Sequence, residues 1–265
     1  MKLRNNFLRA AIFAAAIGTS ALAAATPAGV NYTDLWANEQ EPGWGLSIDQ
    51  QNDVLLGTLF IYDKGALASW YTVNLAFNSI GPNGAVSYTG TLYQTTGPAL
   101  GQPYDPALLK YRQVGNVTIE FGDAAHGILT YTIDGTGASK QISRLTFAPN
   151  SILGTYIGST QDVTYDCKPE SRNGLVTTDP GQFSITQDQD GFVMRFPTCT
   201  VTNGVYKQFG QIGTVEGIYT CLGGVAGEIK FSALQSEQGG LVGTYTGRDN
   251  SCSFRGNIGG MRVMK

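Results

Sequence analysis

The hydrophobicity of this chain alternates with a period of two over much of its length, and this pattern constrains the fold more than any other feature. Residues 44–48, 54–60, 86–88 and 117–121 alternate apolar with small or polar side chains. Such alternation is typical of a strand with one buried face. Turn residues separate the segments at intervals of about 8–12 residues, which is the spacing of a sandwich or a barrel. We therefore predict an all-β protein.

The N-terminus has the features of an export signal. Residues 1–9 are basic, residues 10–17 are apolar, and small residues at 21–23 and 23–25 fit a cleavage site. The apolar run is about half as long as a membrane span, which favours a removed segment over an anchor. We interpret residues 1–25 as a signal peptide of bacterial type. We expect the mature protein in the periplasm or outside the cell.

Charge and composition argue against two classes of partner. The formal net charge is −3, and removal of the signal peptide takes away Lys2, Arg4 and Arg9. The mature chain is therefore acidic and has no visible basic patch, so we expect no nucleic-acid partner. The strands are also short and rich in Gly, Ser and Thr, unlike those of an outer-membrane barrel. We expect a protein that is not integral to the membrane.

All four cysteines lie in the second half of the chain, at Cys167, Cys199, Cys221 and Cys252. An even number of cysteines in an oxidising compartment predicts two disulfides. Three pairings are possible, and the sequence does not choose among them. The spacings are too long for a metal site, which uses closely spaced Cys or His pairs. We expect neither a metal nor a cofactor.

The chain divides into two units of ordinary domain size, residues 31–148 and 151–265, joined near 148–151. In the first unit, short turns imply antiparallel pairing in sequence order, and such a meander closes most naturally into a barrel because closure removes unpaired edges. The long link 96–108 is interpreted as a lid or a crossover. The strands expected in this unit are 43–50, 53–62, 66–77, 85–95, 113–122, 127–134 and 138–147, with 32–37 as a possible extra.

In the second unit, Asp190-Gly191 and Asn203-Gly204 mark hairpins. Glycines recur at strand positions in 154–158 and 243–247, which suggests the coiling points of a closed barrel, with a bulged sandwich as the alternative. We predict two small antiparallel meander barrels, similar in size to lipocalins and avidin, the second one stapled by disulfides. The strands expected in the second unit are 153–159, 182–187, 191–196, 198–202, 205–210, 214–221, 227–234, 241–247 and 253–263.

Several short motifs of the first unit occur in an order that resembles a known module. They are Trp36, the segment Glu41-Pro-Gly-Trp-Gly-Leu-Ser-Ile48, and the segments 50–53, 60–63, 68–71, 88–93 and 96–98. Together they resemble a module of secreted proteobacterial proteins, in which a Gly-Trp-Gly-Leu strand precedes an aromatic hairpin. Leu59 departs from the pattern, because such modules often carry another aromatic residue there. The resemblance implies export and this architecture, and it implies no substrate.

We assign no catalytic residue. The single histidine, His126, lies in a predicted hairpin turn without a flanking nucleophile motif, so we interpret it as a turn residue. Glu39 and Glu41 are the best candidates for a pair of catalytic carboxylates, but a solvated loop explains them more simply. Glu120 alternates with apolar neighbours and should point away from the core. Asp188-Gln-Asp190-Gly191 resembles part of a calcium loop, yet it lacks the further ligands, which favours a hairpin. Glu216 and Glu228 lie on predicted strands with no visible partner.

A set of aromatic residues in the first unit is the candidate ligand-binding set. If they line a barrel, they either fill it as core or leave a pocket for one small apolar molecule. Because Trp70 and Tyr71 are adjacent in a strand, their side chains must point to opposite faces, and one should be exposed. An exposed aromatic rim could stack on a sugar ring or a partner protein. The candidates are Trp36, Trp44, Tyr62, Trp70, Tyr71 and Tyr88.

These observations favour an exported, non-enzymatic binding protein. Its partner would be a small apolar molecule inside the first barrel, or a glycan or protein at the aromatic rim of that barrel. A structural component of the envelope or matrix is the first alternative. A carboxylate-dependent hydrolase is the second.

Overall fold

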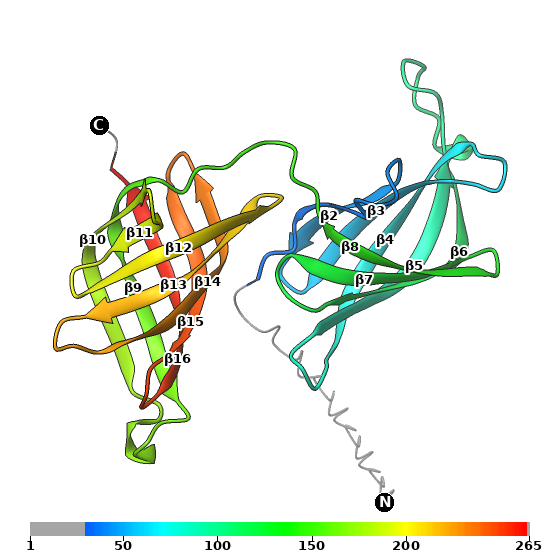
Figure 1. Cartoon of the computed structure of the whole chain (residues 1–265). Coiled ribbons are helices and arrows are strands. Elements are labelled where there is room, and N and C mark those ends of the chain that lie inside the picture. Colours follow the sequence, from blue (N-terminus) through cyan, green and yellow to red (C-terminus); the bar gives the residue numbers. More distant parts are fainter. Residues whose placement is uncertain (1–29, 264–265) are drawn as a thin grey trace, which may run out of the picture.

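The alternating segments form sixteen strands in the computed structural model, which describes residues 30–263. The strands close into two antiparallel barrels of eight, each a meander in sequence order (Figure 1). The predicted fold class is confirmed. The predicted signal peptide, residues 1–25, lies outside the described residues. In the described part of the chain the helices are two short 3-10 turns, and neither could cross a bilayer.

The first barrel contains strands β1 to β8 in unbroken neighbour order, and β1 closes it against β8. Strands β5 and β6 pair directly as far as Thr96 and Lys110. The link 96–108 is therefore an exposed loop between adjacent strands and no crossover, and it carries the turn η1 (Pro106–Leu108). The strands are β1 (Asp34–Ala37), β2 (Gly45–Gln51), β3 (Val54–Tyr62), β4 (Ala68–Ile80), β5 (Val86–Thr96), β6 (Lys110–Phe121), β7 (His126–Ile133) and β8 (Thr136–Arg144).

The second barrel contains β9 to β16, and β9 closes it by pairing with both β10 and β16. The turn η2 (Glu170–Arg172) lies between β9 and β10. The strands are β9 (Gly154–Tyr165), β10 (Val176–Asp188), β11 (Gly191–Arg195), β12 (Cys199–Phe209), β13 (Ile212–Cys221), β14 (Ala226–Glu237), β15 (Gly240–Arg248) and β16 (Ser253–Arg262).

One predicted hairpin in the second barrel is wrong. Asn203-Gly204 does not turn the chain, and β12 runs through it with a shift of register between Thr202 and Val205. Asn203 has a φ of 54°, which is the left-handed conformation that Asn tolerates. A bulge and a hairpin turn both use this conformation, so the dipeptide alone does not distinguish them. The two segments 198–202 and 205–210 are consequently one strand.

The interior of the first barrel is filled by aromatic side chains. Trp36 is fully buried, and Tyr32, Tyr88 and Phe121 are at most 4% exposed. The ring of Tyr32 stacks on that of Phe121 with centroids 3.8 Å apart, and the ring of Tyr88 meets Phe121 edge-on. Aromatic side chains bury large areas and stabilise a core accordingly. This half of the first barrel is therefore core.

Each barrel is locked at its closing seam by an arginine of its last strand. In the first barrel Arg144 is the register partner of Trp36, and its guanidinium lies 4.9 Å from the Trp36 ring centroid. Arg144 also donates to backbone carbonyls of the segment before β1, at Asn31 and Thr33. Trp36 Nε1 donates to the carbonyl of Tyr32 over 3.0 Å. The N-terminal segment is thereby fixed across one end of the barrel.

The second barrel repeats this lock at equivalent positions. Arg262 is the register partner of Tyr156 and lies 5.0 Å from its ring centroid. Arg262 donates to the carbonyls of Ser151 and Leu153, which precede β9. The Tyr156 hydroxyl donates to the carbonyl of Ile152 over 2.8 Å. Both barrels are thus closed at the end where their first strand begins.

The β12–β13 hairpin joins the second barrel to the first (Figure 1). The amide of Gly210 donates to Thr146 Oγ1 over 2.7 Å, and the amide of Gln211 donates to Asp34 Oδ2 over 2.9 Å. The Phe209 ring meets the His126 ring edge-on, with centroids 5.0 Å apart. The hairpin tip therefore contacts the closed end of the first barrel.

Candidate functional site

The open end of the second barrel contains a cavity, which we call the mouth cavity. It lies inside the half of the barrel away from the Arg262 lock, and its volume is about 350 Å³. Pockets for small molecules have volumes of about 300–1,000 Å³. The mouth cavity is therefore large enough for a small ligand.

One side of the mouth cavity is a continuous aromatic wall. The ring centroids of Phe231 and Tyr245 are 5.4 Å apart, as are those of Tyr219 and Phe254. The remaining neighbours, Tyr245 with Phe254 and Phe196 with Phe231, are each 6.2 Å apart. These five rings all border the cavity. Such a wall offers an apolar surface with ring faces for a ligand to pack against.

Gly256 on β16 makes room for this wall. A Cβ atom at this position would collide with the backbone carbonyl oxygen of Gln161, and it would lie 2.7 Å from Cζ of Tyr245 and 2.8 Å from Cβ of Asp162. Real side chains do not approach so closely, so a larger residue here would shift the backbone of β9 as well as these side chains. The glycine therefore lets the Tyr245 ring and the Asp162 side chain lie next to each other inside the barrel.

The opposite side of the cavity is polar and is formed by β9 and β10. Asp162 is the register partner of Thr177, and Thr160 is the register partner of Asp179. Register partners on antiparallel strands point to the same face of the sheet, which here is the barrel interior. All four side chains line the cavity. This side of the cavity therefore carries the carboxylates of Asp162 and Asp179 and the hydroxyl groups of Thr160 and Thr177.

Hydrogen bonds orient the two carboxylates. The Tyr245 hydroxyl donates to Asp162 Oδ1 over 3.1 Å, and Thr198 Oγ1 donates to Asp179 Oδ2 over 2.7 Å. These bonds engage one oxygen of each carboxylate. In residues 30–263 no fully buried side-chain oxygen or nitrogen lacks a hydrogen-bond partner. Both residues line the cavity, and among the described residues no hydrogen bond to the second oxygen of either carboxylate is present.

Burial changes the ionisation of the groups in this cavity. Desolvation raises the pKa of the Asp162 carboxyl above its ordinary value. Burial, reinforced by the carboxylate of Asp249, raises the pKa of Tyr219 to about 12. Burial and the Asp162 carboxylate also raise the pKa of Tyr245 far above its ordinary value. Both tyrosines are therefore neutral at physiological pH and can donate hydrogen bonds.

Both disulfides lie around the mouth cavity. Cys199–Cys221 joins register partners on β12 and β13 and forms part of the lining. Cys167–Cys252 joins the loop after β9 to the loop before β16. The prediction of two disulfides is confirmed. Cys167–Cys252 therefore ties two loops of the open end together, and Cys199–Cys221 ties two strands that reach it.

No family model matches the chain, and neither a curated protein nor a solved structure is significantly similar to it. The resemblance to a Gly-Trp-Gly-Leu module of secreted proteins stays a prediction. The case for a function consequently rests on the geometry of the molecule itself.

The sequence analysis missed the mouth cavity because it ended one predicted strand too early and began the next one too late. The predicted strands 153–159 and 182–187 leave Asp162 and Asp179 in a connection, whereas β9 and β10 extend well beyond both residues. The inward positions of these extensions are Thr and Asp, so the usual apolar alternation is absent. The available signal was the segment 160–164, which is rich in β-branched and polar residues and directly follows a predicted strand. Such a segment can extend the strand with a polar inward face.

The predicted aromatic residues divide between the core and the surface of the first barrel. Trp36, Tyr71 and Tyr88 are buried, and Trp44 is half-buried with its Nε1 donating to Glu41. Tyr62 and Trp70 are exposed. The expectation that Trp70 and Tyr71 point to opposite faces, one outside, agrees with these positions.

Exposed aromatic side chains form a row on the outer face of the first barrel. Phe60 on β3 is the register partner of Trp70 on β4, and it packs over Gly45 on β2. Tyr62 similarly packs over Gly43. Trp70 is 51% exposed and Tyr62 is 58% exposed. We call Phe60, Tyr62 and Trp70 the outer aromatic row.

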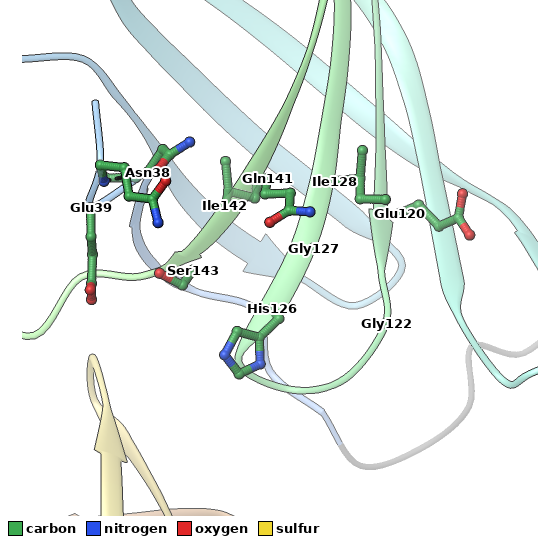
Figure 2. A pocket seen from close by; sticks show the side chains of 12 residues that line it. Asn38, Glu39, Glu120, Gly122, His126, Gly127, Ile128, Gln141, Ile142 and Ser143 are labelled. Atoms are coloured by element: carbon green, nitrogen blue, oxygen red, sulfur yellow. Dashed lines mark hydrogen bonds between the residues drawn. The ribbon is translucent and has the colours of Figure 1, made fainter. Parts of the chain in front are cut away.

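A shallow groove of about 450 Å³ lies on the outside of the first barrel near the seam between β8 and β1 (Figure 2). His126 borders it, and its Nδ1 lies 3.0 Å from Asp123 Oδ2. Ser143 is the register partner of His126, but no hydrogen bond is found between its hydroxyl and the imidazole. Figure 2 shows Glu39 and Glu120 at opposite sides of the groove, and their carboxylates do not point toward each other. The groove assembles neither a nucleophile with its base nor a carboxylate pair.

The other acidic candidates are paired with cations or form turns. Glu41 binds Lys140 over 2.7 Å, and this hydrogen bond lowers the pKa of the Glu41 carboxyl, the opposite of what a general acid needs. Glu216 and Glu228 pair with Lys230 and Arg248 on neighbouring strands. Asp188 accepts the amide of Asp190 in the β10–β11 turn. Within the described ranges, no three His, Cys, Asp or Glu side chains are placed to hold a metal ion.

Proposed function

We propose that this protein is an exported, non-enzymatic binding protein that takes a small, mainly apolar ligand into the mouth cavity of its second barrel. The observation that carries the proposal is an aromatic-walled cavity of about 350 Å³ with a few convergent polar groups. This combination is the usual form of a small-molecule site. Two disulfides at the same end support export, because disulfides persist in oxidising compartments.

The proposal makes the cavity itself responsible for binding, and a bulky side chain can test this. Thr177 lies on the inward face of β10 at the cavity, whereas the adjacent Thr178 lies on the outward face. We expect Thr177→Trp to fill the mouth and to weaken binding of an apolar fluorescent dye by about tenfold or more, since the ligand loses most of its buried area. Thr178→Trp adds the same side chain outside the barrel and should bind the dye normally.

Native mass spectrometry gives an independent readout. Protein recovered from its own host is expected to carry an extra mass that disappears on denaturation. Equal dye binding by the two tryptophan variants, together with a bare mass, would reject the mouth cavity as the site.

A second candidate function follows from the outer aromatic row. Exposed aromatic faces at Phe60, Tyr62 and Trp70 are suited to stacking on the apolar faces of sugar rings. Affinity electrophoresis in gels that contain polysaccharide measures such binding. Trp70→Ala should lose retardation, whereas Tyr111→Ala removes a more exposed aromatic side chain elsewhere on the same barrel and should not. Equal migration of both variants and the native protein would remove the glycan candidate.

A further inference from the structure

We infer that the ligand of the mouth cavity is a cation, with an ammonium group on an apolar body. This inference rests on the proposed function and adds the chemical class of the ligand. The cavity has one apolar aromatic side and one polar side with the carboxylates of Asp162 and Asp179. A ligand that fits both sides must itself be amphipathic.

The charged residues that line the cavity indicate which charge the polar group of the ligand should carry. Asp162 and Asp179 line it, and none of its lining residues is lysine, arginine or histidine. Carboxylates attract a cation and repel an anion, and both effects grow where water is excluded. An anionic ligand such as a fatty acid would place like charges together inside the barrel. The lining therefore disfavours anions.

The hydrogen-bonding groups favour a donor over an acceptor. Tyr245 and Thr198 each donate to one carboxylate oxygen and leave the second oxygen of Asp162 and of Asp179 without a bond. An ammonium group has three donors and no acceptor, so it matches carboxylate oxygens that have no other hydrogen bond. Hydrogen bonds to charged groups are stronger than those between neutral groups. An amine thus satisfies the polar wall better than an alcohol does.

The aromatic wall supports the same class of ligand. The rings of Tyr219, Phe231 and Tyr245 border the space next to Asp162. Ring faces attract a cation when it lies within about 6 Å of the centroid. A metal ion is a poorer fit, because among residues 30–263 no third acidic or imidazole ligand joins the two carboxylates. An organic cation uses the apolar wall, which a metal ion would not.

Three probes with the same apolar chain test the inference: decylamine, decanol and decanoate. Calorimetric titration of the full-length protein at neutral pH gives an affinity for each. We expect decylamine to bind about tenfold more tightly than decanol, which is the effect of one or two hydrogen bonds to charged groups, and decanoate to bind most weakly. If decanol or decanoate binds as well as decylamine, the inference is wrong although the cavity binds ligands. If none of the three probes binds, the proposed function fails, and the inference fails with it.

Variants then assign the effect to the two carboxylates. Asp162→Asn and Asp179→Asn should each weaken decylamine binding about tenfold and leave decanol binding nearly unchanged, which also shows that the variants are folded. Asp188→Asn is the matched control. It removes the same charge from β10, the strand that contains Asp179, but it does so outside the cavity, at the β10–β11 turn. Loss of decylamine affinity in the control as well, or in none of the variants, would overturn the inference.

Discussion

Two arginines with similar positions have different electrostatic surroundings. Arg144 is almost fully buried and pairs with Asp34 Oδ2 over 3.0 Å, and both side chains are only 1% exposed. Burial lowers the pKa of Arg144, while its bond to Asp34 opposes this effect. Arg262 has backbone carbonyls and the Ser236 hydroxyl as partners, and among the described residues no carboxylate pairs with it. The first lock therefore depends on charge pairing, and the second does not.

This difference predicts unequal costs for the same substitution. Arg144→Met leaves the Asp34 carboxylate buried without its cation, which should cost about 3–5 kcal/mol of unfolding free energy. Arg262→Met removes hydrogen bonds to neutral groups and should cost about 1–2 kcal/mol. Denaturant unfolding measures both. Adding Asp34→Asn to Arg144→Met should recover part of the loss, and a double variant no better than the single one would contradict this account.

The ionised carboxyl of Asp162, which the proposed ligand would need, should lower the stability of the ligand-free protein. Its pKa is raised on folding because burial disfavours the charged form. The carboxyl therefore stabilises the ligand-free protein fully when protonated, and this contribution is lost as the pH rises through the folded pKa. Asp162→Asn cannot ionise, and its amide oxygen can still accept from Tyr245. The variant should be more stable than the native protein at neutral pH and should therefore have a higher Tm.

The pH dependence of that difference is the stricter check. It should vanish as the pH falls below the ordinary Asp pKa of about 3.9, where both proteins carry a neutral side chain at this position. Thermal unfolding followed by circular dichroism across this range measures it. A stability gain that persists unchanged at acid pH would show that ionisation of Asp162 is not its cause.

At the scale of strands and turns, the sequence predicts most of the first barrel well. Alternation and turn residues place its strands within a few residues, because apolar side chains point inward along nearly every strand. The second barrel is harder. Polar residues at the inward positions of β9 and β10 remove the apolar alternation over about half of each strand, so these parts are not recognised as strand. The left-handed Asn203 belongs to a bulge and not to a turn.

The candidate site could not be predicted, because it depends on contacts between distant segments. Asp162 and Tyr245 meet only when β9, β16 and β15 are neighbours in a closed barrel. The disulfide pairing has the same origin, since closure brings the loop of Cys167 to that of Cys252. The spacing of these residues along the chain predicts neither the contact between Asp162 and Tyr245 nor the disulfide pairing. Residue types alone gave the correct number of disulfides.

The two disulfides close loops of different length, which predicts different contributions to stability. Cys167–Cys252 spans 85 residues and Cys199–Cys221 spans 22. In the chain-entropy description, closing the longer loop restricts the unfolded chain more, by about 1 kcal/mol. Replacing Cys167 and Cys252 with Ala should therefore destabilise the second barrel about 1 kcal/mol more than replacing Cys199 and Cys221. Reduction of both bonds should unfold the second barrel before the first, and simultaneous loss of both barrels would count against independent units.

At the scale of the whole molecule, the two barrels share a closing lock and differ in what they enclose. The first is filled by Trp36, Tyr88 and Phe121, whereas the second keeps a cavity opposite its lock. Asp34 links this division of roles to the docking of the barrels. It pairs with Arg144 in the first lock and also accepts the amide of Gln211 from the second barrel. The filled barrel thus offers a closed end against which the second barrel is held.

Gly210 is the residue on which this docking depends most directly. Its φ is 57°, and an added Cβ would collide with the Asp34 carboxylate and approach Arg144 Cβ to 2.9 Å. We expect Gly210→Ala to loosen the hairpin from the first barrel and to free the linker, which is tied by Thr146 to the Gly210 amide. Phe147 in the linker is 76% exposed and gives chymotrypsin a cleavage site.

Native-state proteolysis at Phe147 therefore reports the docking. Cleavage should become about tenfold faster in Gly210→Ala, as expected when about 1.4 kcal/mol is lost from a local opening equilibrium. Gly223→Ala is the matched control, because Gly223 also has a positive φ, of 88°, but has open space around its Cβ position. Both variants place alanine at a positive φ, and only Gly210→Ala disturbs the contact with Asp34. Equal cleavage rates in the two variants would mean that the linker is protected by something other than the hairpin, and that the barrels do not depend on this contact for their arrangement.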